Sequence, residues 1–455
     1  MEKPLILMGA TPIYGHTMPL RAIARGLIER GFDITFVTGS HFREPIEAIG
    51  ARFHPYSGYS DISEATVNTR FPGRVALAGE ELGAYDNEHI FVRAMPSQYE
   101  SIQLALKDLK EREPGRKVIL MVENGCLGII PSILGAPGIK PDAHITIGVL
   151  PLQLSSIDTA PFGTCIPPDS SPSGRERNAR INQKNRNDSQ DLHTIFLSLL
   201  ASTGAKTTDH LYTDAAVVLP DRYIQMCIPE IEYSRSDLPS TVRFAGGLPH
   251  GSRDPAQSFP DFWHELIANE AVKRSGKGNG KGKKVVAVSQ GTFSNSPTQL
   301  LLPTINALAK HDDLLVVAAL GARNATLPPS VSVPGNVRVA DFIPFDELLP
   351  YCDVFVTNGG YGAIQHAITN GVPMVVAGNT EEKPENACRV AWAGIGVNLK
   401  TGTPSEEALE DAVVKILGDG SFKQKIEGMK RKMEESDALG TIAEAVLELG
   451  GGNNQ

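Results

Sequence analysis

Short apolar runs alternate with amphipathic stretches from the start of the chain. Leu5 to Met8 is apolar, residues 9–18 read as a loop, and Pro19 suits the first turn of a helix that continues to Arg30. Gly31 ends this stretch, and the next apolar run covers Asp33 to Thr38. This order predicts a strand–helix–strand unit, which is the building block of parallel sheets.

The same alternation continues through the first half. Further strands are predicted at Lys117 to Val122, His144 to Val149 and Ala215 to Leu219. Residues 167–191 are polar and rich in Ser, Arg and Asn, which fits either a surface flap on the acceptor side or a plain disordered insertion. The stretch from Thr241 to Pro249 reads as the end of this half.

A second set of alternating elements follows a Gly- and Lys-rich stretch at residues 274–284. We interpret that stretch as a solvated linker, because no strand-then-helix frame with a Walker pattern surrounds its lysines. Helical sequence covers about Glu406 to Leu417 and continues to Leu447. The predicted strands are Lys284 to Ser289, Leu314 to Ala319, Val337 to Ala340, Val354 to Val356 and Val372 to Ala377. Two successive α/β halves predict an α/β fold with two Rossmann-like domains.

The most informative segment runs from Asp353 to Asn386 and reads DVFVTNGGYGAIQHAITNGVPMVVAGNTEEKPEN. A strand leads into Gly359 and Gly360, a predicted helix covers Tyr361 to Asn370, and a second strand follows Gly371. Small residues at such a turn let a ligand approach the backbone, and the first free N–H groups of the helix form an anion site. Taken alone, the turn glycines also fit an ordinary strand–helix–strand crossover.

The whole segment, however, resembles the donor-binding signature of the UDP-glycosyltransferases. The matching elements, in order, are Gly360-Tyr361, Gly371-Val372-Pro373, Glu382-Lys383 and Pro384-Glu385-Asn386. The form of the glycine turn and Gln365 resemble soluble microbial, in particular fungal, members. The resemblance implies the GT-B arrangement, in which two Rossmann-like domains face a cleft. It gives an acceptor domain over residues 1–246, a nucleotide-sugar domain over 247–430, and a C-terminal helix over 431–455 that packs back on the first domain.

For the donor, the resemblance implies a diphosphate cradle and a ribose contact. Backbone and hydroxyl groups after the strand that ends at Ser289 are expected to reach the diphosphate, although a strand followed by Gly-Thr is common for structural reasons. Gln365 stands where the family has a ribose-binding glutamate, and its amide can still hold a hydroxyl pair. Asn358 replaces the usual histidine, so the phosphates are expected to depend more on helix amides. The implied diphosphate residues are Gln290, Gly291, Thr292, Asn358, Gly359, Gly360, Tyr361 and Gly362.

The base and the sugar of the donor have candidates of the same kind. Phe342 stands where an aromatic stacks on uracil, and the backbone of Ile343 is expected to read the base edge. Phe345 replaces a polar residue of the family, and both phenylalanines also fit a purely structural role in the core. Glu382 and Lys383 occupy the pair that contacts sugar hydroxyls. Lys383 departs from the usual glutamine, which leaves the exact sugar open.

On the acceptor side, the resemblance implies that His16 is the general base. A loop histidine alone is more often structural, but His16 lies within Gly-His-Thr-Met-Pro, as in the family, and a neutral imidazole suits deprotonation of a hydroxyl near pH 7. The family places a carboxylate partner after the fourth strand. We expect Glu123 in this role, with the neutral Asn124 as the alternative. Acceptor contacts are expected from Ile13, Tyr14 and Met18.

Composition narrows the range of partners. Lys and Arg number 43 against 52 Asp and Glu, a net charge of −9, which disfavours nucleic acid and anionic membranes as partners. The five scattered cysteines lack metal-site spacing, so reduced thiols are expected. No secretory leader, membrane anchor, apolar span or Asp-x-Asp metal motif is visible. We therefore expect a cytoplasmic monomer or weak homodimer that needs no metal and no cofactor beyond its UDP-sugar co-substrate.

These observations predict an enzyme, a UDP-glycosyltransferase that moves a hexose, most simply glucose, with inversion to a hydroxyl of a small apolar, phenolic acceptor. Three alternatives stay open at this level: another nucleotide sugar such as a deoxysugar donor, a sterol or lipid acceptor, and a non-catalytic small-molecule binding protein on the same scaffold. A NAD-dependent dehydrogenase is disfavoured, since residues 9–15 do not form Gly-x-Gly-x-x-Gly and no acidic residue is placed for a ribose.

Overall fold

The computed structural model describes residues 2–247, 259–275, 282–291 and 296–451. The chain forms two compact units. Unit 1 comprises Met1–Pro249 together with Ser436–Gln455, and unit 2 comprises His250–Glu435. Each unit is built on its own parallel sheet, so the predicted α/β class with two Rossmann-like sheets is confirmed.

Unit 1 carries a sheet of seven parallel strands in the order β3-β2-β1-β4-β5-β6-β7. The central strand β1 is buried on both faces, as expected for a strand with helices above and below it, and this explains its uninterrupted apolar sequence. The strands are β1 (Leu5–Gly9), β2 (Asp33–Thr38), β3 (Arg52–Pro55), β4 (Val118–Glu123), β5 (Ala143–Gly148), β6 (Arg222–Gln225) and β7 (Val242–Phe244).

Helices cover both faces of this sheet. They are α1 (Tyr14–Glu29), α2 (Arg43–Glu47), α3 (Val67–Arg70), α4 (Gly79–Asp86), α5 (Met95–Arg112), α6 (Ile129–Ile133), α7 (Pro172–Asp188), α8 (Gln190–Ser202), α9 (Tyr212–Val218) and α17 (Ala438–Leu449). Short helical turns occur at η1 (Ser40–Phe42), η2 (Gly58–Ser60), η3 (Pro72–Ala76), η4 (Asn87–Val92) and η5 (Pro229–Ile231).

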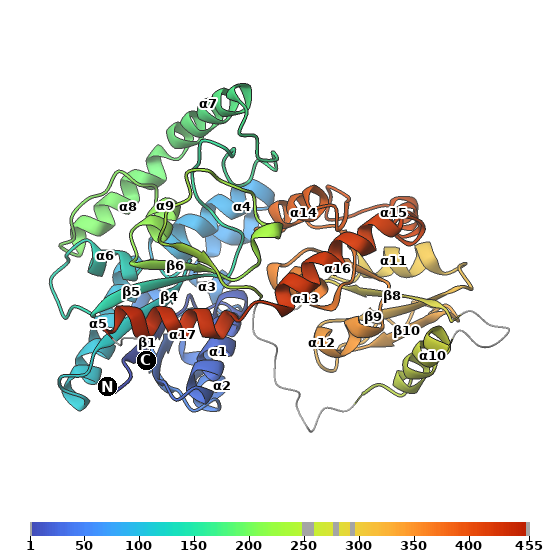
Figure 1. Cartoon of the computed structure of the whole chain (residues 1–455), viewed down its shortest axis with the longest axis horizontal. Helices are drawn as coiled ribbons and strands as arrows, with labels where there is room; N and C mark the ends of the chain where they lie inside the picture. The colour runs from blue at the N-terminus through green and yellow to red at the C-terminus, as the bar shows by residue number, and fades with distance from the viewer. Residues whose placement is uncertain (1, 248–258, 276–281, 292–295, 452–455) are drawn as a thin grey trace. The chain divides into compact units, whose positions relative to one another are not determined.

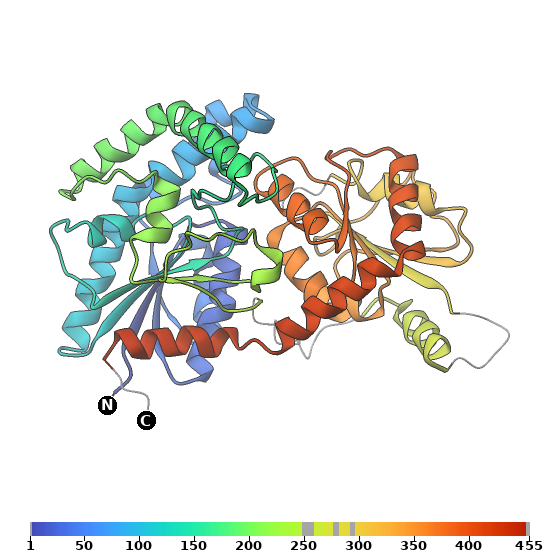
Figure 2. The ribbon, with the colours of Figure 1, turned by 45° about the horizontal axis from the view of Figure 1, so that its top comes forward.

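Alternation along β1 divides the core of unit 1 in two. Leu5 and Leu7 point into a cluster with α5, α6 and α8, whereas Ile6 and Met8 point into a cluster with α1 and α17. Both views accordingly show α8 and α17 on opposite sides of the unit 1 sheet (Figure 1 and Figure 2). The helix that carries His16 therefore shares a core with the last helix of the chain.

Unit 2 carries six parallel strands in the order β10-β9-β8-β11-β12-β13. Its strands are β8 (Lys284–Ser289), β9 (Leu314–Ala319), β10 (Val337–Ala340), β11 (Val354–Thr357), β12 (Met374–Val376) and β13 (Gly396–Asn398). Its helices are α10 (Trp263–Ser275), α11 (Leu301–Leu308), α12 (Phe345–Leu348), α13 (Tyr361–Asn370), α14 (Lys383–Trp392), α15 (Glu406–Gly418) and α16 (Gly420–Glu434), with a short turn η6 (Leu349–Tyr351).

The chain returns to unit 1 after α16, at Ser436. Helix α17 then packs on α1 so closely that a Cβ atom added at Gly26 would collide with the side chain of Leu439. Ile442, Ala445 and Val446 complete the contact and are fully buried. The end of the chain is therefore part of the core of the first unit.

Helix α1 corrects one local prediction. It begins at Tyr14, not at Pro19, so residues 14–18 form its first turns and His16 lies on a helix, not on a loop. Pro19 was taken as the first helical residue because proline favours that position. The earlier start is held from elsewhere in the chain, since the Tyr14 amide donates to Glu64 at 2.6 Å.

Two further predictions were wrong. Residues 215–219 lie in helix α9 and its C-cap, and the strand follows at Arg222–Gln225; a short run of buried Ala and Val fits either type of element. The polar segment 167–191 is neither a flap without structure nor a disordered insertion, because residues 172–188 form helix α7. Ser171 caps this helix by accepting from the Gly174 amide, and Arg175 pairs with buried Asp158 at 2.8 Å.

Candidate active site

The carboxyl ends of β1 and β4 bring His16 and Glu123 together. These strands are neighbours, with Gly9 opposite Val122, so the helix after β1 and the last residue of β4 meet at one edge of the sheet. His16 lies in the first turn of α1 with 7% of its surface exposed, and its Nδ1 is 2.6 Å from Oε2 of Glu123. The pair is thus a buried contact between residues 107 positions apart.

Glu123 is fully buried and accepts two further hydrogen bonds. The Thr11 amide donates to Oε1 at 2.8 Å, and the Gly125 amide donates to Oε2 at 2.6 Å. Burial by itself raises the pKa of the Glu123 carboxyl, but the His16 imidazole and the two amides outweigh burial and bring the pKa below its ordinary value. Glu123 is therefore a carboxylate whose position is fixed by three donors.

Asn124, the alternative partner of His16, faces elsewhere. Its side-chain oxygen accepts from the Val149 amide at 3.0 Å, and its backbone amide donates to the carbonyl of Ile147. Asn124 thus ties the end of β4 to the end of β5. Of the two candidates, Glu123 is the one that contacts the imidazole.

The three predicted acceptor residues have different surroundings. Ile13 precedes α1 and packs against a small apolar cluster that contains Ile90 and Phe91. Tyr14 is 49% exposed, which leaves its ring available to a ligand. Met18 instead packs against the sheet core beneath α1. Ile13 and Tyr14 therefore lie at the start of α1, Met18 is turned towards the interior, and the acceptor contacts of all three stay predictions.

In unit 2, the predicted phosphate turn joins β11 to α13. Gly359 has φ +86°, and a Cβ atom there would lie 2.5 Å from Val376, so only glycine fits. At Gly360 and Gly362 an added Cβ would meet no atom of the described chain within 4 Å. The first turn of α13 thus has a bare, open side, while Tyr361 is buried. Backbone of this kind can approach a phosphate closely.

Asn358 and Gln290 hold the neighbouring loops together. The Asn358 amide group donates to the backbone carbonyl of Gln290, and the Gln290 side chain accepts from Leu301 at 3.1 Å. Asn386 secures the turn from the other side by donating to the Gly359 carbonyl at 2.8 Å. Gly291 has φ +75°, and Thr292 lies outside the described residues. Asn358 therefore supports the turn from within, and its predicted contact with the phosphates stays a prediction.

Gln365 is the most unusual residue of this region. It lies one turn into α13 with 2% of its surface exposed, and neither its Oε1 nor its Nε2 has a hydrogen-bond partner among the described residues. A buried polar group without a partner costs about 1–3 kcal/mol. The amide of Gln365 therefore keeps its full hydrogen-bonding capacity within the described part of the chain.

Phe342, Ile343 and Phe345, which follow β10, have different surroundings. Phe342 is half-buried, and the guanidinium of Arg323 lies 5.2 Å from its ring centroid. Ile343 is 3% exposed, so only its backbone could reach a base. Phe345 packs edge-on against Phe355 at 5.2 Å between centroids, which matches the structural alternative for this residue.

The pair Glu382 and Lys383 begins α14. Glu382 is the N-cap residue, and Lys383 is 8% exposed and forms an ion pair with Glu381. Burial lowers the pKa of Lys383 to about 8. Glu381 has φ +53°, an uncommon backbone conformation for a residue with a side chain. Lys383 therefore contacts its own loop, and Glu382 is the more accessible of the two.

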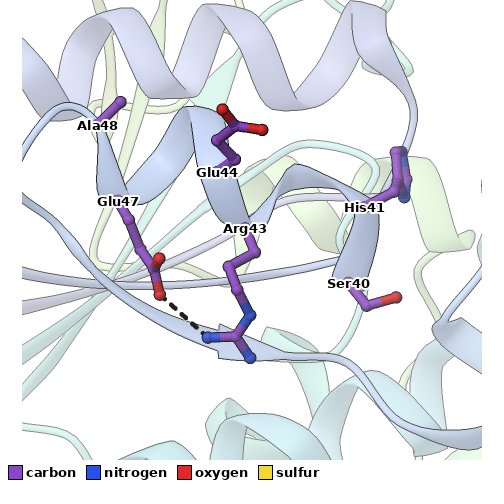
Figure 3. Close-up of a pocket in the computed structure, with 6 residues that line it drawn as sticks. All are labelled: Ser40, His41, Arg43, Glu44, Glu47 and Ala48. Carbon is purple, nitrogen blue, oxygen red and sulfur yellow. Dashed lines mark hydrogen bonds and ion pairs between the residues drawn. The ribbon is translucent and has the colours of Figure 1, made fainter.

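A separate hollow lies in unit 1, between η1 and α2 (Figure 3). It measures about 470 Å³ and is lined by Ser40, His41, Arg43, Glu44, Glu47 and Ala48. Arg43 and Glu47 pair across one helical turn at 3.0 Å. None of the predicted site residues lines it, and its side chains are those of a solvated surface.

The described residues contain neither a metal-binding cluster nor a membrane-spanning helix. No group of three or more His, Cys, Asp or Glu side chains in that part of the chain is arranged to hold a metal ion. Among the helices of the described ranges, none has the length and apolar character needed to cross a bilayer. All five cysteines are free thiols, as predicted.

Sequence reasoning missed two residues near the imidazole. Phe91, on the turn η4, lies with its ring centroid 5.4 Å from that of His16, and Glu64 holds the amide at the start of α1. Neither belongs to a recognisable motif, and both come from irregular segments between β3 and α5. Only the fold shows that these segments return to the start of α1.

Comparison with known proteins places these features in context. Residues 303–449 match the family described as "Erythromycin biosynthesis protein CIII-like, C-terminal domain". The chain is 39% identical to UDP-glycosyltransferase 2 of Phaeomoniella chlamydospora, over 98% of this chain and 96% of the relative. It is 37% identical to UDP-glucosyltransferase 1 of Beauveria bassiana, over 96% and 94%.

Solved structures agree on the fold. The calicheamicin glycosyltransferase CalG4 superposes with a TM-score of 0.67 at 19% identity, over 99% of each chain. This likeness identifies the fold as GT-B, as predicted. Because full-length relatives exceed 30% identity, the chain belongs to the UDP-glycosyltransferase family and is an enzyme.

Proposed function

We propose that this enzyme transfers a hexose, most simply glucose from UDP-glucose, with inversion to a hydroxyl group of a small apolar, phenolic acceptor. The names of the relatives support a UDP-linked donor, since several are UDP-glucosyltransferases. The observation that carries the chemistry is the buried contact of 2.6 Å between His16 Nδ1 and Glu123.

In the proposed reaction, His16 is the general base. The Glu123 carboxylate accepts a hydrogen bond from the Nδ1–H group of His16, so the lone pair is on Nε2 and can take the proton of the acceptor hydroxyl. The acceptor oxygen then forms a bond to the anomeric carbon while the bond from that carbon to the UDP oxygen breaks, and UDP leaves with the electron pair. Attack from the face opposite UDP inverts the configuration. Glu123 stabilises the imidazolium that forms.

Unit 2 is proposed to bind the donor. The unpartnered amide of buried Gln365 suits a pair of ribose hydroxyls, one accepting and one donating. The open first turn of α13, at Gly360 and Gly362, suits the diphosphate, because its amides and the helix dipole favour negative charge. We propose that these groups stabilise the charge of departing UDP and that the reaction needs no metal ion.

The acceptor class is proposed from the surroundings of the base. Ile13, exposed Tyr14 and the half-buried ring of Phe91 present apolar and aromatic surface around the start of α1. Such surface favours an aromatic or otherwise apolar aglycone that carries one reactive hydroxyl.

The proposal is tested with His16→Ala, UDP-glucose and a panel of phenols, by measuring UDP release together with glucoside formation. We expect kcat to fall about 10²- to 10⁴-fold, the range for loss of a general base, while calorimetric UDP affinity stays unchanged. His210→Ala, at an exposed position in the same unit, is the control and should retain full activity.

Near-normal turnover by His16→Ala would remove His16 from its role. A preference for a deoxysugar nucleotide over UDP-glucose would overturn the proposed donor. A preference for sterols over phenols would overturn the proposed acceptor class. UDP binding without any transfer would point to the non-catalytic alternative.

A further inference from the structure

The imidazole of His16 is confined by more than its bond to Glu123. Gly125 lies against its edge: a Cβ atom there would stand 2.9 Å from Cε1 and 3.0 Å from Nδ1 of His16, and 2.8 Å from the ring of Phe91. These distances are shorter than van der Waals contact, so no side chain larger than hydrogen fits without displacing a ring. Phe91 approaches the imidazole from another direction, with 5.4 Å between centroids and 47° between planes.

Phe91 owes its position to an uncommon backbone. It lies on η4, a π-helical turn between α4 and α5, in which the Arg93 amide bonds to the Glu88 carbonyl five residues back, at 2.8 Å. Its neighbours are buried in different clusters: Ile90 lies in the small apolar cluster with Ile13, and Val92 lies in the sheet core. Both flanking residues therefore anchor the turn. π-Helical turns are rare and occur often at functional sites.

Gly125 is linked to the same group through its backbone. Its amide donates to Oε2 of Glu123 at 2.6 Å, and this is the oxygen that His16 Nδ1 contacts. The result is one packed assembly of four residues, in which neither the imidazole nor the phenyl ring can move without disturbing the other. Its members are His16, Phe91, Glu123 and Gly125. A single hydrogen bond fixes one atom of an imidazole, whereas the two flanking contacts restrict rotation of its plane.

We infer that Phe91 and Gly125 are positioning residues for the base: together they hold the His16 imidazole in the plane in which Nε2 can accept the acceptor proton. This inference rests on the proposed role of His16. Neither residue exchanges a proton. Phe91 also shields the imidazole and its bond to Glu123 from water, which strengthens that bond.

The inference is tested with Gly125→Ala, Phe91→Ala and Phe91→Leu. The methyl group of Gly125→Ala must push the imidazole aside, and a shift of about 1 Å in a reacting group costs about 100-fold in rate. We expect kcat to fall on that order for Gly125→Ala and about tenfold for Phe91→Ala, with partial recovery in Phe91→Leu, which refills the space. Calorimetric UDP affinity should stay unchanged throughout.

A matched control separates positioning from general packing. Phe71 belongs to the apolar cluster against which Phe91 packs. Its ring contacts the rings of Tyr59 and His89 and not that of His16 among the described contacts. Phe71→Ala should lower the thermal midpoint as Phe91→Ala does but leave the pH dependence of kcat/KM unchanged. In Phe91→Ala, water reaches the imidazole and favours its charged form, so the acid limb of that profile should move to higher pH.

A readout without turnover keeps the inference independent of the proposed reaction. Nitrogen NMR of histidine-labelled protein reports the His16 tautomer and its titration in the absence of substrate. We expect one tautomer in the wild type and a mixture, with a shifted titration, in Gly125→Ala and Phe91→Ala. If the wild type shows no transfer yet the NMR changes occur, the proposed function fails and the positioning role stands. Unchanged spectra, or unchanged kcat and pH profile in folded Phe91→Leu and Phe91→Ala, would overturn it.

Discussion

At the scale of single residues, Glu123 decides the chemistry of the candidate base. Its carboxylate accepts from His16, Thr11 and Gly125 and is fully buried. An acid in such a place normally becomes neutral, but here the pKa is lowered, because the donors outweigh burial. The charge that orients the imidazole is therefore maintained by His16 itself and by backbone amides that belong to two different loops.

Replacing this charge gives a first prediction. In Glu123→Gln, one side-chain oxygen becomes an NH₂ group that faces the donors Thr11 or Gly125, a buried donor–donor conflict of about 1–3 kcal/mol. We expect a lower free energy of unfolding by that amount and a loss of kcat of about 10²-fold or more, since a neutral partner stabilises the imidazolium poorly. Chemical denaturation and steady-state kinetics measure the two effects. Glu111→Gln, at an exposed position of α5, is the control.

The same residue predicts a pH dependence of stability. Because the folded pKa of Glu123 lies below its ordinary 4.5, its carboxylate stabilises the folded state above that pH, and this contribution is lost as pH falls through the folded pKa. The difference in unfolding free energy between wild type and Glu123→Gln should be constant near pH 7 and shrink below about pH 4. A difference that grows on acidification would contradict the lowered pKa.

The sequence predicts which residue types meet at the site better than it predicts what each one contacts. His16 and Glu123 follow adjacent parallel strands, so their meeting could be foreseen from strand order alone. The ligand contacts expected of Asn358 and Lys383 stay predictions, and the sequence does not predict that Asn358 bonds to the Gln290 carbonyl or that Lys383 pairs with Glu381. Those contacts depend on loop conformations, such as the positive φ of Glu381, which no local pattern reveals.

At the scale of elements, helix α1 depends on a cap from another segment. Its N-cap residue, Ile13, has no polar side chain that could cap the first turn, and the first turn contains no acidic residue. Glu64 supplies both the cap and the acidic group, because its carboxylate accepts from the Tyr14 amide at 2.6 Å. The same carboxylate lies 3.6 Å from His41. Burial raises the pKa of Glu64, but His41 and the Tyr14 amide lower it by more, so the pKa lies below its ordinary value. The group therefore stays charged beside the positive end of the helix dipole.

Removing this cap should loosen the turn that carries His16. We expect Glu64→Ala to destabilise unit 1 by about 1 kcal/mol, the usual effect of losing a helix cap, and to lower kcat without changing UDP affinity. Glu64→Gln keeps an acceptor oxygen and should lose less of both. Thermal denaturation and kinetics test this, with Glu47→Ala on exposed α2 as a control for surface charge. Equal effects of Glu64→Ala and Glu47→Ala would contradict the capping role.

Elements with strong patterns were predicted well, and the exceptions share a cause. Strands such as Asp33–Thr38 and Leu314–Ala319, and helix Tyr361–Asn370, were placed to the residue because apolar runs end at glycine or polar residues. The early start of α1 and the helix α7 depend on contacts from distant segments, through Glu64 and Asp158. A local pattern cannot include partners that are 50 residues away, as for Tyr14 and Glu64, or 17 residues away, as for Arg175 and Asp158.

At the scale of the whole molecule, unit 1 is discontinuous in sequence. Its core includes Ile442, Ala445 and Val446 of α17, which follow unit 2 along the chain. Gly26 permits the close approach of α17 to α1, because any larger residue there meets Leu439. The last helix therefore bears directly on the helix that carries His16.

This contact is tested by a double-mutant cycle. We expect Gly26→Ala to destabilise unit 1 by about 1–3 kcal/mol through overpacking, although alanine has the higher helix propensity. Leu439→Ala alone should cost about 2 kcal/mol or somewhat less, since Leu439 is only partly buried. The double variant should be more stable than the sum of the two losses predicts, because Leu439→Ala makes room for the new methyl group. Strictly additive losses would show that the two side chains do not meet.

The return of α17 to the first unit also sets an order of events during synthesis on the ribosome. A nascent chain folds its earliest complete region first, yet here the core beneath α1 lacks the side chains of α17 until the second unit has been translated. A released fragment that ends at residue 435 should accordingly bind chaperones or aggregate. Helix α1 would then acquire the support of α17 only after the second unit has been translated, so a polypeptide without α17 would not become prematurely active.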